Sequence, residues 1–247
     1  MDRKYLDLLP QPIKLMVAQI EGAIKAHIIV RLRRMGDPAI ASIDHLPTLD
    51  CYMNMGKMFV TIILSNDSPQ AHMLAHEVIH AWRYIVVGEP RLQIVIDAEK
   101  ATFPHVLEND LAHIFVIPEE LKYYPGALQY WDSLYADLIE PIAGVVSVQR
   151  RLGRPSTLFR SDLMRHWLIL SSIPKSASLT RLRAVLDQAN YLEDANALYE
   201  EVTEAGLDKG RMIGAALRHL GLSTDNYELA RYDVPNRRCT TEPIPTA

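Results

Sequence analysis

The stretch Ala75–Trp82, with the sequence Ala-His-Glu-Val-Ile-His-Ala-Trp, is an H-E-x-x-H motif. It lies in an apolar run, Ala71–Val87, that contains no helix breaker and therefore predicts a helix. Residues four apart share a face of a helix, so His76 and His80 can present their imidazoles to one metal ion. Glu77 follows His76 directly and is placed to reach a metal-bound water rather than the metal itself. We interpret the motif as a zinc site; the alternative is a chance match, against which its helical setting argues.

The residues before the motif predict one helix and a strand hairpin. Pro12–Ala26 has apolar residues at helical spacing and Pro12 at its start. His27–Leu32 is β-branched and apolar and favours a strand, although the first helix could also continue through it. Leu49–Met53 alternates apolar and polar residues, and Met58–Leu64 is continuously apolar, which is typical of a half-buried and a buried strand. Gly56 between them predicts a hairpin turn.

The residues after the motif are predicted to be mostly helical. Gly88 and Pro90 should end the motif helix, and Pro118 should end a helix over His105–Val116. Further helices are expected over Ala127–Arg151 (interrupted near Pro141), Leu158–Leu170, Leu179–Gln188, Leu192–Ala205 and Asp208–Leu220. The predicted fold class is α+β, with a zincin-like catalytic core over residues 1–125, an α-helical region over 126–232 and a disordered tail over 233–247.

Composition narrows the functional classes. The 247 residues are 49% hydrophobic and 23% charged, as in ordinary globular proteins. A net charge of −4 argues against nucleic-acid binding as the main role. The two cysteines form no disulfide framework, and no run approaches eighteen apolar residues, so we expect a cytoplasmic protein without a membrane partner.

A catalytic zinc site usually takes three protein ligands and a water, so the motif needs a third ligand. Trp82–Pro90 contains no histidine, which leaves a carboxylate on a later helix as the common solution. Glu108 is the best candidate, because it lies 28 residues after His80 beside the apolar face of a predicted helix. His113, on the same helix, is an alternative ligand. The other competitors are Glu89, Glu99 and Asp110.

His113 has two further interpretations. It could donate a hydrogen bond to the oxyanion that forms during attack on a carbonyl. It could also be a structural histidine whose hydrogen bonds are satisfied inside the fold. The sequence leaves all three roles open.

Four segments together resemble the ImmA/IrrE family of zinc-dependent metallopeptidases. They are Thr61–Leu64, Met73–His80, Leu107–Ala112 and Ile117–Glu120, and the resemblance extends over about residues 45–122, roughly a third of the chain. The resemblance implies that His76, His80 and Glu108 bind zinc and that Glu77 is the general base. It also implies a peptide or protein substrate.

The sequence therefore predicts hydrolysis of a peptide bond by a zinc-activated water, with Glu77 taking the water's proton and passing it to the leaving amine. One alternative is a non-catalytic interaction protein with structural zinc, although such a site has no need of Glu77. Another is a protease toxin or effector, which the sequence does not separate from a regulatory peptidase.

Overall fold

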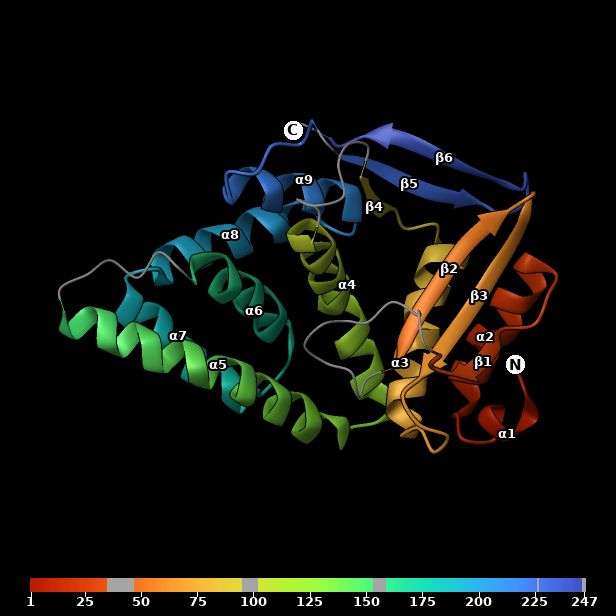
Figure 1. Ribbon diagram of the computed structural model, residues 1–247, viewed down its shortest axis with the longest axis horizontal. Helices are drawn as coiled ribbons and strands as arrows, with labels where there is room; N and C mark the ends of the chain where they lie inside the picture. The colour runs from red at the N-terminus through yellow and green to blue at the C-terminus, as the bar shows by residue number, and fades with distance from the viewer. Residues whose placement is uncertain (35–46, 95–101, 153–158, 226, 246–247) are drawn as a thin grey trace. The chain divides into compact units, whose positions relative to one another are not determined.

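The computed structural model describes residues 1–34, 47–94, 102–152, 159–225 and 227–245 (Figure 1). The chain divides into two compact units, one of Met1–Arg91 with Ala230–Glu242 and one of Leu92–Leu229 with Pro243–Ala247. The described residues combine helices with two three-stranded sheets, which confirms the α+β class. Within the described ranges, no helix has both the length and the apolar character needed to cross a membrane.

The first unit contains the motif helix and the sheet before it. Its elements up to residue 87 are α1 (Arg3–Leu6), α2 (Gln11–Ile24), β1 (Ile29–Leu32), β2 (Thr48–Asn54), β3 (Lys57–Leu64), α3 (Ala71–Trp82) and the π-helical turn η1 (Arg83–Val87). The predicted helix, hairpin and motif helix are thus all confirmed. α2 packs against α3 and buries Ile13, Val17 and Ile20 along one face, as its 3.6-residue periodicity requires.

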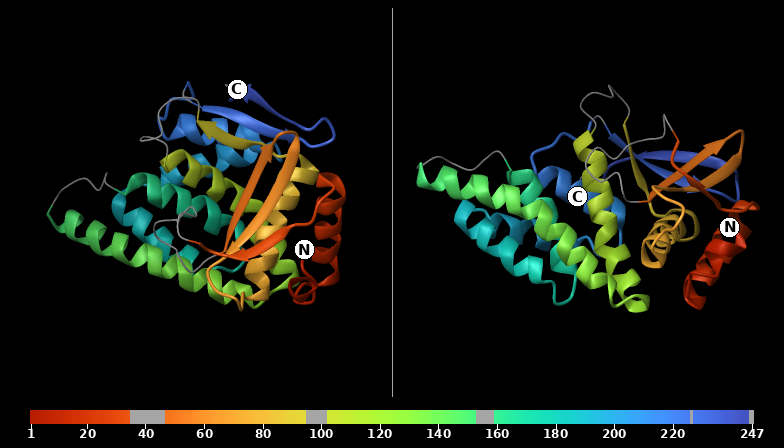
Figure 2. Two further views of the ribbon diagram at one scale, coloured as in Figure 1. Left: turned by 45° about the vertical axis from the view of Figure 1, so that its right-hand side comes forward. Right: turned by 60° about the horizontal axis from the view of Figure 1, so that its bottom comes forward.

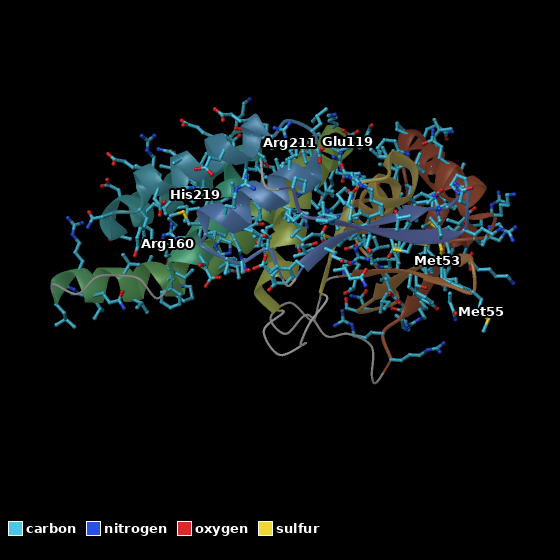
Figure 3. The ribbon with its side chains drawn as sticks, turned by 90° about the horizontal axis from the view of Figure 1, so that it is seen from above. Met53, Met55, Glu119, Arg160, Arg211 and His219 are labelled. Carbon is cyan, nitrogen blue, oxygen red and sulfur yellow. The ribbon has the colours of Figure 1, made fainter. Side chains whose placement is uncertain are left out.

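The sheet of the first unit has the order β1-β3-β2, with β3 parallel to β1 and antiparallel to β2. The hairpin turn is Met55-Gly56, and both residues have positive φ angles, 47° and 70°, as a two-residue type I′ turn demands. Met55 is 97% exposed at the tip of the hairpin, and Figure 3 shows it at the end of the strands beside Met53. β3 is the buried central strand, because its residues from Val60 to Leu64 have almost no exposed surface.

The second unit is built from six helices in the described residues. They are α4 (Thr102–Tyr123), α5 (Ala127–Arg151), α6 (Arg160–Ser172), α7 (Ala177–Ala189), α8 (Leu192–Glu204) and α9 (Lys209–His219). The expectation that Pro118 ends a helix is wrong, since α4 continues through it to Tyr123. Buried Val116 and Ile117 precede the proline and buried Glu120 follows it, so packing on both sides offsets the lost backbone hydrogen bond. α5 likewise runs through Pro141 without a break.

The C-terminal segment is ordered, against the prediction of a disordered tail. β5 (Tyr227–Asp233) and β6 (Arg238–Pro243) form a sheet with β4 (Arg91–Ile94) in the order β4-β5-β6 (Figure 2). Leu229, Val234 and Ile244 bury their side chains, which is the apolar burial that composition alone did not reveal. The unit boundary at Arg91 also differs from the predicted one at residue 125, because α4 packs against α6 and α9.

Candidate metal centre

α3 presents the H-E-x-x-H motif from the interior of the first unit. Every residue from Met73 to Ala81 is buried, so the helix has no solvent-facing side over the motif. His76, Glu77 and His80 are only 3%, 8% and 4% exposed. Three polar side chains buried on consecutive turns of an apolar helix have a desolvation cost, which is typical of a functional site.

The two histidines converge as the spacing predicted. His76 Nε2 and His80 Nε2 lie 3.1 Å apart, and the ring centroids are 4.8 Å apart in an edge-to-face arrangement. Two Zn–N bonds of about 2.05 Å at a tetrahedral angle would place their nitrogens about 3.3 Å apart. The observed separation is close to that value, so the pair fits a zinc ion without a change of helix geometry.

Neighbouring residues fix the second histidine. The Tyr84 ring stacks on the His80 ring with centroids 6.1 Å apart, and Arg91 lies 5.0 Å from the Tyr84 centroid in a cation–π contact. Tyr84 lies in η1, the π-helical turn that follows α3 directly, and such turns occur often beside functional sites. Their joint effect is to hold the imidazole of His80 in one orientation.

The general-base candidate Glu77 lies on the side of α3 that faces strand β2. Burial raises the pKa of the Cys51 thiol to about 12, and the negative charge of Glu77 adds to that increase. The Cys51 carbonyl accepts hydrogen bonds from the Tyr232 hydroxyl at 2.7 Å and from Arg91 Nη1 at 3.4 Å. Tyr232 of β5 therefore binds β2 at Cys51, the residue whose pKa the charge of Glu77 raises.

Strand β2 is at the edge of its described sheet. Asn54 pairs with Lys57 across a two-residue turn, which makes it a hydrogen-bonded pair and fixes the alternation along the strand. The backbone groups of Leu49, Cys51 and Met53 therefore point away from β3. The two donors on the Cys51 carbonyl agree with this register.

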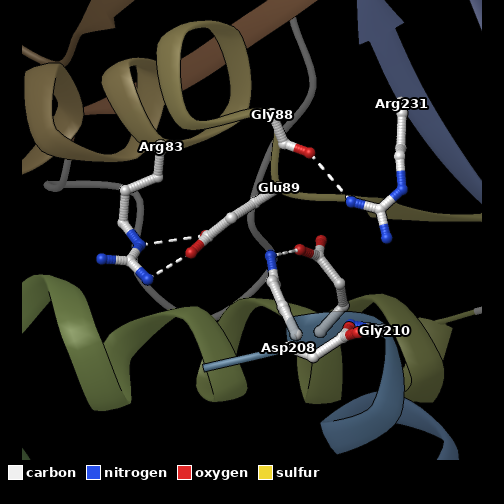
Figure 4. Close-up of polar contacts among 8 residues, drawn as sticks. Arg83, Gly88, Glu89, Asp208, Gly210 and Arg231 are labelled. Atoms are coloured by element: carbon white, nitrogen blue, oxygen red, sulfur yellow. Dashed lines mark hydrogen bonds and ion pairs between the residues drawn. The ribbon is translucent and has the colours of Figure 1, made fainter. Parts of the chain in front are cut away.

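Glu89, one of the weaker ligand candidates, has a structural role. Arg83 donates to both oxygens of its carboxylate, with 2.9 Å from Nε to Oε2 (Figure 4). This ion pair links the first residue of η1 to the loop that follows it. In that loop, Arg231 of β5 donates a hydrogen bond to the Gly88 carbonyl at 3.0 Å. Glu89 is thus explained by this bidentate ion pair. Glu99 lies outside the described residues.

In the second unit, Glu108 lies on α4 and forms an ion pair with Lys209 at the start of α9. Both side chains are almost fully buried, at 5% and 0% exposed. Asp208 caps α9 by accepting from the amides of Gly210 and Arg211, and this cap holds Lys209 at the first helical position (Figure 4). A fully buried ammonium requires such a partner, so Lys209 is a residue of this region that no pattern in the sequence predicted.

His113 and Asp110 follow on α4 and have different surroundings. His113 is half-buried, with Asn109 Nδ2 3.4 Å from its Nε2 and the Trp131 ring 5.9 Å away. Asp110 pairs with Arg165 of α6 at 2.9 Å, and burial raises the pKa of its carboxyl to about 7 although Arg165 opposes the change. Asp110 is therefore a structural carboxylate of the helical unit.

The donor chemistry of the described residues suits a metal ion. His76 and His80 could hold one within the first unit, each through one ring nitrogen. Neutral imidazoles are among the commonest ligands of catalytic zinc. Comparison of the chain with models of protein families, with characterised proteins and with solved structures finds no match. The resemblance to the ImmA/IrrE family remains a prediction carried by the motif residues.

Proposed function

We propose that the chain is a zinc-dependent metallopeptidase whose metal is held by His76 and His80 of α3 and by a third ligand from α4. The observation that carries the proposal is the 3.1 Å separation of the two buried Nε2 atoms, with Glu77 between them in sequence. A structural zinc site has no use for that carboxylate, whereas a hydrolase requires it.

Two residues of α4 are candidates for the third ligand. Glu108 is the ligand that the family resemblance implies, and its carboxylate would share its charge between the metal and Lys209. His113 is the candidate whose choice would make all three protein ligands imidazoles. If Glu108 binds the metal, His113 is left to donate a hydrogen bond to the oxyanion of the reacting carbonyl.

Glu77 performs the proton transfers in this proposal. Zinc, when bound, would supply a Lewis acid that acidifies a water and polarises the scissile carbonyl. The Glu77 carboxylate accepts the proton of the attacking water and then delivers it to the nitrogen of the leaving amine, which departs as a neutral group. Burial of Glu77 keeps bulk water from competing for that proton.

The edge strand β2 offers a place for an extended peptide. Leu49 and Met53 point their backbone groups away from β3, so a substrate strand can add there by hydrogen bonds that do not depend on its sequence. The Cys51 carbonyl between them is already bonded to Tyr232. We therefore expect recognition of unstructured peptide segments with weak sequence preference along this edge.

The experiment compares wild type with Glu77→Gln. The amide keeps the size of the side chain but cannot accept the proton, so the variant should retain zinc and fold while hydrolysis of a peptide library falls by at least about 10²-fold. Glu119→Gln is the matched control, because Glu119 is bonded to Lys122 on α4 and should leave activity unchanged. Cleavage by Glu77→Gln at the wild-type rate would contradict the proposal. So would a zinc-loaded wild type that cleaves nothing, and a non-catalytic interaction protein would then be the better account.

A further inference from the structure

Helix α5 carries an apolar stripe that the described residues of the helical unit leave largely exposed. Its members recur at alternating intervals of three and four residues and are Leu138, Pro141, Val145, Val148 and Leu152. Val145, Val148 and Leu152 are 36%, 46% and 62% exposed. This spacing is the a/d heptad pattern with which one helix packs against another.

The stripe is distinct from the side of α5 that belongs to the core. Tyr135, Ile139, Ile142 and Val146 lie on another face of the helix and are buried, and α5 packs against α7. Figures 1 and 2 show α5 as a long helix along the edge of the helical unit. α5 therefore has one apolar face that its own unit uses and a second that it does not.

A glycine beside the middle of the stripe permits another helix to approach α5 closely. Gly144 is exposed in the middle of α5, and a Cβ built on it would meet no atom of the described residues within 4 Å. Glycine inside a helix costs about 1 kcal/mol relative to alanine, and no residue in the described part of the chain comes close enough to require it here. A helix from outside that crosses at this point would use the missing side chain.

The charges beside the stripe are arranged reciprocally about Gly144. Asp137 lies seven residues before it and Arg151 seven residues after it, both exposed in the described structure. If a second copy of α5 lies antiparallel with Gly144 facing Gly144, Asp137 of each copy faces Arg151 of the other. In a parallel pair each of these charges would face its own kind or an apolar position, so the pattern favours the antiparallel arrangement.

We propose that this face of α5 is the contact of a homodimer, in which two copies of the helix pack antiparallel about a two-fold axis at Gly144. Val145 and Val148 form the centre of the contact, and two Asp137–Arg151 ion pairs close its ends. The stripe from Leu138 to Leu152 spans only about 21 Å at 1.5 Å per residue, so we expect a dissociation constant of about 1–100 μM. The dimer is independent of the metal centre.

Sedimentation velocity over about 1–200 μM protein tests the proposal. Wild type should shift from monomer to dimer, and Val145→Lys should remain monomeric throughout. Asp137→Arg or Arg151→Glu alone should weaken the dimer about tenfold, because each places like charges opposite one another twice. The double variant Asp137→Arg/Arg151→Glu should restore association to within about threefold of wild type.

Arg150→Glu is the matched control, since Arg150 neighbours Arg151 but lies on the other side of the exposed surface of α5. It should associate as wild type does. A wild type that stays monomeric at the highest concentration would overturn the proposal, as would a dimeric Val145→Lys. Failure of the double charge swap to restore association would overturn the antiparallel arrangement.

Discussion

His166 predicts how the stability of the protein depends on pH. The side chain lies on α6, is 7% exposed and contacts the Tyr135 ring edge to face at 5.6 Å. Its Nδ1 has no hydrogen-bond partner among the described residues. Burial, with a smaller contribution from the Arg165 charge, lowers the pKa of the imidazole from 6.5 to about 3. His166 should therefore stay neutral in the folded protein across the ordinary pH range.

The sign and size of the effect follow from proton binding. Between pH 6.5 and about 3 the unfolded chain binds a proton at His166 that the folded chain does not, so the free energy of unfolding falls as pH falls. From pH 7 to pH 4.5 the loss is about 2.5 kcal/mol, because the slope approaches 1.4 kcal/mol per pH unit. His166→Leu keeps an apolar side chain of similar size and removes this contribution.

Urea unfolding of wild type and His166→Leu at a series of pH values measures the contribution of His166 to the pH dependence of stability. The difference in unfolding free energy between wild type and His166→Leu should change by about 2.5 kcal/mol over this range, and metal effects common to both cancel. A difference that does not vary with pH would refute the claim that His166 is buried in its neutral form.

Two further predictions concern thiols and glycines. Cys239 is exposed while Cys51 is buried with its pKa raised to about 12, so a thiol reagent at pH 8 should label one cysteine in the native protein and both in denaturant; equal native rates would contradict this. A Cβ at Gly214 would lie 2.5 Å from the Pro245 carbonyl oxygen, whereas one at Gly22 would have no atom of a described residue within 4 Å. Gly214→Ala should therefore lower the unfolding free energy by about 1–3 kcal/mol and Gly22→Ala raise it by about 0.5–1, both read from urea titrations; a stabilising Gly214→Ala would show the prediction wrong.

Local patterns in the sequence predicted the elements that local physics controls. The four-residue spacing of His76 and His80 predicted a shared helix face, and the structure brings their nitrogens together. Alternation in β2 and the glycine at position 56 predicted the hairpin, because the turn needs positive φ angles that glycine adopts readily. These features depend on neighbours within a few residues.

The incorrect predictions concern elements whose structure depends on packing between residues far apart in the sequence. Pro118 and Pro141 are helix breakers by local preference, yet both lie inside helices that tertiary contacts hold together. The tail from Asp233 has a polar composition, but β6 pairs with β5 and joins a sheet whose partners are distant in sequence. The Glu108–Lys209 pair joins residues 101 apart, and no local signal marks a buried lysine.

Zinc binding is the most direct test of the central claim. Competition with a chromophoric chelator should give about one Zn²⁺ per wild-type chain, and His76→Ala or His80→Ala should lose most of it. Glu108→Ala and His113→Ala, measured alongside, identify the third ligand as the one whose loss releases the metal, and Glu89→Ala should keep its zinc because that carboxylate is bound by Arg83. Full retention of zinc by both His76→Ala and His80→Ala would contradict the account at its base.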